Sequence, residues 1–186
     1  MKIFFCLLFS LLLSSMSFAQ RADFFREDIT FSLNRTNLDV DGYYWFANPS
    51  ERIVESEIFY PFANYSNEKI DSIRLFNISK GEKVRFTKDE NKGIYFRLNI
   101  APHDTLLFQI GYRQTLSADS AVYILKTTQG WGKPIDLAEY KLVVPSSLPI
   151  RKFTYEPDRS YKIENSTVYY WKKEKFMPKE DMIFFF

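Results

Sequence analysis

The stretch "GIYFRLNIAPHDTLLFQIGYRQ", residues 93–114, decides the fold class. Apolar and polar side chains alternate in two runs, which the short turn "APHD" separates. Side chains of a strand point alternately to its two faces, so each run has one apolar face. Those faces carry Ile94, Phe96, Leu98 and Ile100 in the first run, and Leu106, Phe108, Ile110 and Tyr112 in the second. The pattern predicts two strands with one buried face each.

Similar runs recur along the whole chain, with turn residues between them. Aromatic residues make up 18% of the chain, and they suit the half-buried surface of a sheet. We found no sustained helical spacing of apolar residues. We expect strands near residues 26–34, 38–47, 52–60, 69–78, 82–88, 93–100, 104–114, 120–128, 137–144, 150–155, 159–164, 167–173 and 180–186. Short strands at such regular spacing predict an all-β protein.

The arrangement that fits best is an antiparallel β-sandwich, either immunoglobulin-like or jelly-roll-like. No repeat or linker-like stretch divides the chain, and its length suffices for a sizeable core. The segment "PSSLP" at residues 145–149 is where a C-terminal hairpin layer could separate from the main sandwich.

The first 19 residues have the three-part pattern of a secretory signal peptide. Lys2 is followed by an apolar run over residues 3–13, and Ser17 and Ala19 precede the expected cleavage site. The apolar run is short for a membrane span, so an uncleaved anchor is the less favoured alternative. We therefore expect a cleaved signal peptide over 1–19 and a single β-sandwich domain over 20–186, exported to the periplasm or cell surface.

Composition argues against several kinds of chemistry. The chain has 25 basic and 23 acidic residues, so no global positive charge favours nucleic acid. Its one cysteine, Cys6, lies in the signal peptide, and its one histidine, His103, cannot build a transition-metal site alone. Glu55 and Glu57 share one face of a strand, which is typical of a solvated face. We expect no catalytic residues, no metal and no cofactor.

The aromatic run Tyr43–Phe46 has three interpretations. A strand that is apolar on both faces is typically central and covered on both sides, and we favour this interpretation. A sugar-stacking platform would instead place the rings on one exposed face. A lipid-facing girdle is the third possibility.

Two loop residues are candidate contacts for a partner, Trp131 and His103. Trp131 stands between two glycines in "TTQGWGKPI", residues 127–135. The glycines allow the indole to project from the loop tip or to fold over the end of the sandwich, and both alternatives stay open. The expected partner is an envelope protein or a polysaccharide.

An Asp-Ser/Thr-apolar pattern occurs at Ser72, Thr105 and Ser120. It is similar to the acceptor motif for O-glycosylation of exported proteins in some Gram-negative bacteria. Asp and Ser also favour turns and strand starts through local hydrogen bonds, which is the alternative explanation.

Two stretches resemble exported bacterial β-sandwich domains of unknown function. In "YYWFANPSERIVESEIFYPFANYSNEKIDSIRLFNISKGEKV", residues 43–84, one strand ends near an aromatic-x-Asn and the next ends in an aromatic-Pro. "YILKTTQGWGKPIDLAEYKLVVP", residues 123–145, has a strand, a Gly-Trp-Gly turn and a returning strand. The resemblance implies the fold and the compartment, and it implies no catalytic residues.

The C-terminus "KEDMIFFF", residues 179–186, supplies the main alternative. Its terminal aromatic resembles the assembly signal of outer-membrane β-barrels. Many of the expected strands are too short to cross a bilayer, which argues against this alternative. The favoured interpretation is an exported, non-catalytic β-sandwich with a binding or scaffolding role in the bacterial cell envelope. A small outer-membrane barrel and a carbohydrate-binding module are the two alternatives.

Overall fold

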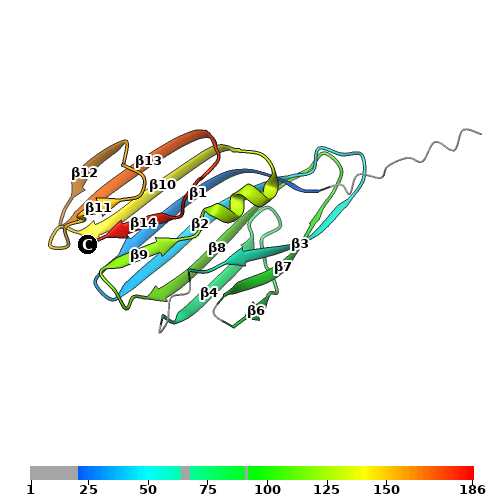
Figure 1. Cartoon of the computed structure of the whole chain (residues 1–186). Coiled ribbons are helices and arrows are strands. Elements are labelled where there is room, and N and C mark those ends of the chain that lie inside the picture. Colours follow the sequence, from blue (N-terminus) through cyan, green and yellow to red (C-terminus); the bar gives the residue numbers. More distant parts are fainter. Residues whose placement is uncertain (1–20, 64–67, 91) are drawn as a thin grey trace, which may run out of the picture.

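The computed structural model describes residues 21–63, 68–90 and 92–186. In these residues the chain forms fourteen strands and one short 3-10 helix (Figure 1). The expected signal peptide over 1–19 and its cleavage site lie outside the described residues. Within the described part, no helix is long and apolar enough to cross a membrane.

The largest sheet has eight strands and forms the back of the molecule in Figure 1. Its order is β12 (Arg159–Ile163), β13 (Ser166–Phe176), β10 (Ile135–Pro145), β1 (Asp23–Leu33), β2 (Asn37–Ala47), β8 (Thr105–Thr115), β4 (Ile70–Asn77) and β5 (Glu82–Lys83). All neighbouring strands are antiparallel except β1 and β10, which pair in parallel.

Two three-stranded sheets complete the fold. One has the order β11 (Lys152–Phe153), β14 (Met182–Phe185), β9 (Ser120–Tyr123), and the other β3 (Val54–Pro61), β7 (Gly93–Ile100), β6 (Thr87–Asp89). Both pack against the same face of the large sheet. The ring of Phe31 in β1 contacts Tyr123 of the first small sheet at 5.1 Å between centroids. Tyr44 in β2 contacts Tyr60 of the second at 5.5 Å.

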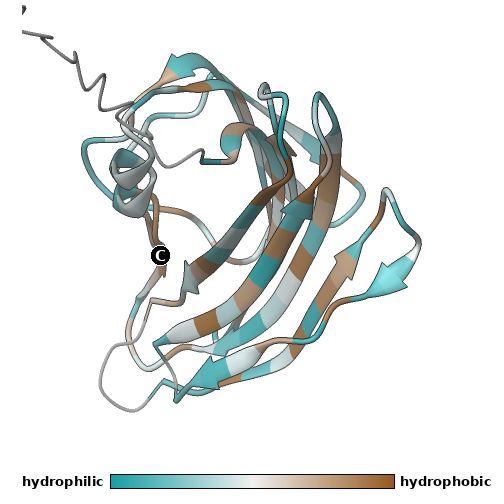
Figure 2. Cartoon of the chain, turned by 90° about the vertical axis from the view of Figure 1, so that its right-hand side faces the viewer, coloured by the Kyte–Doolittle hydropathy of each residue, from teal (hydrophilic) through white to brown (hydrophobic). Residues whose placement is uncertain are grey.

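This arrangement confirms the all-β sandwich. The strands carry alternating hydrophobic and hydrophilic residues, as the colour bands in Figure 2 show. In β7 and β8 the alternation matches burial, since the apolar faces predicted from residues 93–114 are buried. The turn between these strands carries the chain from a small sheet to the large one. After residue 149 the β12–β13 hairpin extends the large sheet, whereas β11 and β14 join a small one.

The interpretation of Tyr43–Phe46 as covered on both faces is wrong for one face. Tyr44 and Phe46 are buried beneath the small sheets. Tyr43 and Trp45 point to the opposite face of the large sheet, where Tyr43 is 37% exposed and Trp45 is half-buried. The strand is central within its sheet, between β1 and β8, but a sandwich covers only one face of each layer.

The strand expected over 120–128 is shorter than predicted. β9 ends at Tyr123, and the chain then forms the 3-10 helix η1 (Lys126–Trp131). Asp181, distant in sequence, causes this turn because its Oδ1 accepts hydrogen bonds from the backbone N–H groups of Leu125 and Lys126, both at 2.9 Å. Gly132 ends the helix in the left-handed region, with φ of 74°.

Candidate ligand-binding cavity

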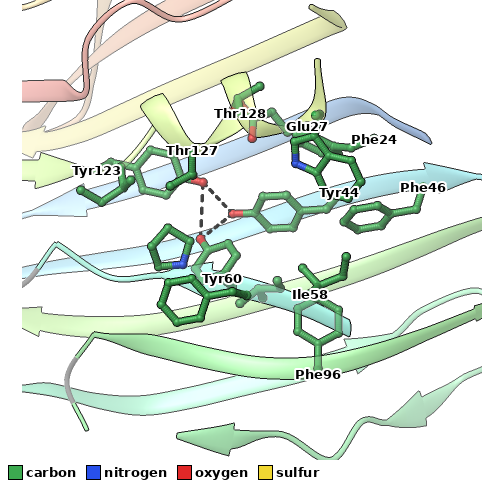
Figure 3. Close-up of a pocket in the computed structure, with 15 residues that line it drawn as sticks. Phe24, Glu27, Tyr44, Phe46, Ile58, Tyr60, Phe96, Tyr123, Thr127 and Thr128 are labelled. Carbon is green, nitrogen blue, oxygen red and sulfur yellow. Dashed lines mark hydrogen bonds between the residues drawn. The ribbon is translucent and has the colours of Figure 1, made fainter. Parts of the chain in front are cut away.

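A cavity of about 60 Å³ lies where the three sheets meet. Phe24, Glu27 and Tyr44 of the large sheet, Tyr60 of β3, Tyr123 of β9 and Trp131 of η1 are among its lining residues. We call it the aromatic cavity. Figure 3 shows side chains from all three sheets converging on it, with Thr127 and Thr128 on the side of η1.

A bulge in β1 gives the cavity its acidic group. The pairing of β1 with β2 shifts register between Phe24 and Arg26. Strict alternation would place Phe24 and Glu27, three residues apart, on opposite faces. The extra residue of the bulge turns both side chains inward, and both are buried. The cavity therefore combines an aromatic wall with a carboxyl group.

Three tyrosine hydroxyls form a hydrogen-bonded triangle in the cavity wall (Figure 3). Tyr44 Oη lies 2.7 Å from Tyr60 Oη and 3.0 Å from Tyr123 Oη, and Tyr60 donates to Tyr123 at 3.4 Å. The triangle joins β2, β3 and β9, so it ties one strand of each sheet together. Buried hydroxyls need such partners, because an unpaired one costs about 1–3 kcal/mol.

Glu27 is the buried acid of the cavity, with only 2% of the residue exposed. Tyr140 of β10 donates a hydrogen bond to its Oε1. Loss of hydration on burial raises the pKa of Glu27 to about 7, and the hydrogen bond from Tyr140 only partly offsets that increase. Glu27 therefore changes charge near neutral pH, far above the range of an exposed glutamate.

The surrounding tyrosines remain protonated at neutral pH. Burial raises the pKa values of Tyr44, Tyr60, Tyr123 and Tyr140 well above their usual range, and the charge of Glu27 raises each further. These hydroxyls can donate hydrogen bonds but cannot supply a positive charge. The described residues that line the cavity include no lysine, arginine or histidine.

Trp131, a candidate contact from the sequence, forms part of the cavity rim. Its ring packs at 5.7 Å from Phe24 and 5.8 Å from Phe46, and the residue is half-buried. The Arg21 guanidinium lies over the indole, 4.9 Å from its centroid, and Nη1 donates to the Gly130 carbonyl at 2.8 Å. Trp131 thus folds against the sandwich and still borders a cavity.

His103, the second candidate, lies elsewhere. It occupies the turn between β7 and β8 with φ of 56°, and its Nε2 lies 3.0 Å from Glu51 Oε2. Its side chain is exposed and does not line the aromatic cavity. The structure therefore does not bring Trp131 and His103 together.

The three candidate glycosylation residues lie at strand starts or irregularities. Ser72 is exposed at a bulge of β4, with φ of 54° and a 2.9 Å hydrogen bond to Asp71. Thr105 is exposed at the start of β8, and Ser120 is half-buried at the start of β9. Glycosylation of these residues stays a prediction.

The outer face of the large sheet offers a second aromatic feature. Tyr43 and Trp45 have ring centroids 6.5 Å apart, and the Arg26 guanidinium lies 4.6 Å from the Trp45 centroid. Neighbouring polar groups include Asp41, which accepts a hydrogen bond from Gln109 at 2.8 Å.

The two glutamates that share a face of β3 lie at the surface. Glu55 accepts a hydrogen bond from Asn99, and Glu57 is also exposed.

Metal-binding groups are not clustered in the described residues. Across 21–63, 68–90 and 92–186, no three His, Cys, Asp or Glu side chains come close enough to hold an ion together.

Sequence reasoning missed Glu27, although a signal for it existed. In "DFFREDITFSL", residues 23–33, the apolar positions Ile29, Phe31 and Leu33 define the inward face. Glu27 stands two residues before Ile29, in the same register, and an acid at an inward position is unusual. The tyrosine triangle has no such signal, because it joins residues from three separate sheets.

No protein-family model and no curated protein matches the chain. Solved structures do match its fold. A candidate nutrient binding protein from Legionella pneumophila aligns with a TM-score of 0.68 at 13% identity, over 89% of this chain and 67% of that one.

An M1 zinc metallopeptidase from Deinococcus radiodurans aligns with a TM-score of 0.54 at 12% identity, over 88% of this chain. The alignment covers 42% of the peptidase, so this chain spans less than half of that protein. The E323A mutant of a two-domain M1 zinc metallopeptidase, with L-arginine bound, aligns with the same TM-score at 14% identity. At these identities the likeness shows the fold alone.

Proposed function

We propose that this chain is an exported, non-catalytic binding protein of the bacterial cell envelope, and that the aromatic cavity holds its ligand. The observation that carries the proposal is Glu27, a buried carboxyl that faces an accessible cavity of about 60 Å³. A polar group in an apolar, concave site is the usual layout of small-molecule binding sites.

The design of the cavity supports binding. Aromatic side chains supply apolar contact area, while the tyrosine hydroxyls and Glu27 supply a few oriented polar groups. The tyrosine triangle links all three sheets, so its hydroxyls are held in place before a ligand arrives. Preorganised groups of this kind reduce the entropic cost of binding.

The similar structures give further support. The Legionella protein is a candidate nutrient binder and shares most of this chain's architecture. The signal-peptide pattern of residues 1–19 is consistent with a role outside the cytoplasm. Peptidase activity is not part of the proposal, because the chain matches less than half of the peptidase and its described residues hold no cluster of metal ligands.

The test is an NMR titration of the purified, 15N-labelled protein with a panel of small neutral and charged amphiphiles. We expect saturable amide shifts around Glu27, Tyr123 and Trp131. Thr127 is exposed at the cavity and offers a blocking variant, since Thr127→Phe would fill the entrance without changing the core. The matched control is Lys126→Phe, on the same helix but outside the lining.

The blocking variant should abolish the shifts, and the control should retain them. Saturable shifts that persist in Thr127→Phe, or no saturable shift with any compound, would contradict the proposed site.

A second candidate function is polysaccharide binding by the outer face. Tyr43 and Trp45 lie side by side on that face, beside the polar pair Asp41 and Gln109, which suits stacking against a sugar ring. Arg26 already covers the indole of Trp45, so a sugar would have to displace it. Sedimentation with insoluble polysaccharides, lost in Trp45→Ala and retained in Trp131→Ala, would favour this function.

A further inference from the structure

We propose that the aromatic cavity binds the ammonium head of a small cationic ligand, with Glu27 as its counter-ion. This inference rests on the proposed function and adds the chemical class of the ligand. Aromatic faces attract cations through their ring quadrupoles, and a carboxylate supplies the opposite charge. The cavity combines both features.

The hydrogen-bond pattern leaves Glu27 able to accept a ligand. In the described residues its one side-chain hydrogen bond comes from Tyr140 and reaches Oε1, so Oε2 is free to accept from a donor in the cavity. None of the described residues that line the cavity is basic, so among them no side chain supplies a cation to the carboxylate. A buried carboxylate without a counter-ion is costly, and a bound cation would remove much of that cost.

Other ligand classes fit less well. An anionic ligand would face Glu27 and the electron-rich faces of the rings, and the described lining residues would offer it no basic group. A neutral apolar ligand would leave Oε2 without a partner. An ammonium group donates hydrogen bonds and carries the required charge.

A contact between a cation and an aromatic ring already exists at the rim of the cavity. Arg21 places its guanidinium over the indole of Trp131, 4.9 Å from the ring centroid. This contact is on the rim rather than inside, because Arg21 does not line the cavity. A cation near the entrance therefore already finds an aromatic partner in the folded chain.

The volume limits what can enter. One water molecule needs about 10–15 Å³ of accessible cavity volume, so a cavity of about 60 Å³ holds a group of only a few heavy atoms. A primary or secondary ammonium with a short methylene stem fits this space. The rest of a larger ligand would extend out of the cavity past Thr127, which is exposed and lines the cavity.

The inference has a defined pH dependence. The titratable groups facing Glu27 are Tyr44 of β2, Tyr60 of β3, Tyr123 of β9 and Tyr140 of β10, and all four stay neutral near pH 7. Among these five described groups, Glu27 is the one that changes charge there, since its pKa is about 7. Affinity for an alkylammonium should therefore rise by at least about tenfold between pH 5.5 and pH 8.

The experiment compares two probes of similar size, n-butylammonium chloride and 1-butanol, by 15N NMR titration at pH 8. We expect the ammonium to bind at least about tenfold more tightly than the alcohol, with shifts centred on the aromatic cavity. Glu27→Gln should remove this preference. Glu57→Gln is the matched control, because Glu57 lies on β3 beside the cavity-lining Ile58 but is exposed, and it should keep the preference.

A second measurement on the wild-type protein covers the case in which Glu27→Gln does not fold. Calorimetry at pH 6.5 in buffers of different ionisation enthalpy should detect proton release when n-butylammonium binds, because the cation favours ionised Glu27.

The outcomes separate the two proposals. If both probes bind in the cavity equally well and no proton is released, the ammonium inference is wrong and the proposed binding site stands. If neither probe gives saturable cavity shifts, this inference fails, and the proposed function is then decided by the wider panel and the Thr127→Phe variant.

Discussion

The ring of Tyr44 lies across Gly42, and the two residues share the inward face of β2. A Cβ atom at Gly42 would lie 2.6 Å from the Cζ of Tyr44, closer than real side chains approach. The absence of a side chain at Gly42 is therefore what lets the Tyr44 hydroxyl reach Tyr60 and Tyr123.

Gly42→Ala should displace the Tyr44 ring and open the tyrosine triangle. We expect the free energy of unfolding to fall by about 1–3 kcal/mol, as is typical of overpacked cores. Urea denaturation followed by tryptophan fluorescence would measure the change. Gly130→Ala is the control, because an added Cβ there meets nothing within 4 Å, and it should leave stability nearly unchanged. Equal stability of the two variants would show that Gly42 does not hold Tyr44 in place.

Glu27 should make the protein less stable as pH rises. Its pKa is about 7 in the folded state, against an ordinary value of 4.5. Below pH 4.5 the carboxyl is protonated in both the folded and the unfolded state, so it does not lower the free energy of unfolding. As pH rises, the unfolded chain ionises first, so stability is lost up to about pH 7 and then levels off. The full loss is about 3 kcal/mol.

Glu27→Gln isolates this effect. The amide keeps the size of the side chain and an acceptor for Tyr140, but it cannot ionise. Between pH 4.5 and pH 8 the variant should lose about 3 kcal/mol less stability than the wild type, measured by denaturation at each pH. Parallel stability profiles for the two proteins would mean that Glu27 is not buried as described.

Trp131→Ala should weaken ligand binding and cost some stability. The indole contacts Phe24 and Phe46 at the rim of the aromatic cavity. We expect affinity for n-butylammonium to fall by at least about fivefold, which corresponds to loss of one cation–π contact. Trp45→Ala, on the opposite face of the large sheet, should bind as the wild type does. A similar loss in both variants would point to a general effect on the fold.

Mass spectrometry of the intact protein from its native host would test the processing of the chain. Cleavage after Ala19 predicts a mature protein that begins at Gln20. If Ser72, Thr105 or Ser120 carries a glycan, the mass should exceed that of residues 20–186, and substitution of the modified residue by alanine should remove the excess. A mass equal to the bare chain would exclude the glycans, and a mass including residues 1–19 would exclude cleavage.

The sequence predicted the strands well where alternation was strict. Residues 93–100 form β7 over that same range, and their buried positions are the predicted ones. Such agreement is expected because one face of each strand must be apolar to pack against the other layer.

Three features escaped prediction because they depend on partners distant in sequence. The end of β9 is set by Asp181, which caps the backbone at Leu125 and Lys126. The exposure of Tyr43 depends on which face the small sheets cover. The inward turn of Phe24 and Glu27 together depends on a bulge in β1.

The candidate site was predicted only in part. Trp131 was identified by its glycine-flanked loop, and it does border the cavity. His103 was identified as a residue of the turn between two expected strands, and it does lie in an exposed turn, beside Glu51 and away from the cavity. Glu27 was missed although its register with Ile29 marks it as inward-facing.

The pKa of Glu27, with and without a bound cation, tests most directly whether this carboxyl is the counter-ion of a ligand. The side-chain carboxyl carbon of Glu27 can be followed by 13C NMR between pH 4.5 and pH 9. The structure predicts a midpoint of about 7 for the free protein, and a lower midpoint when n-butylammonium is present. An ordinary midpoint near that of an exposed glutamate, or one that the cation leaves unchanged, would contradict the account.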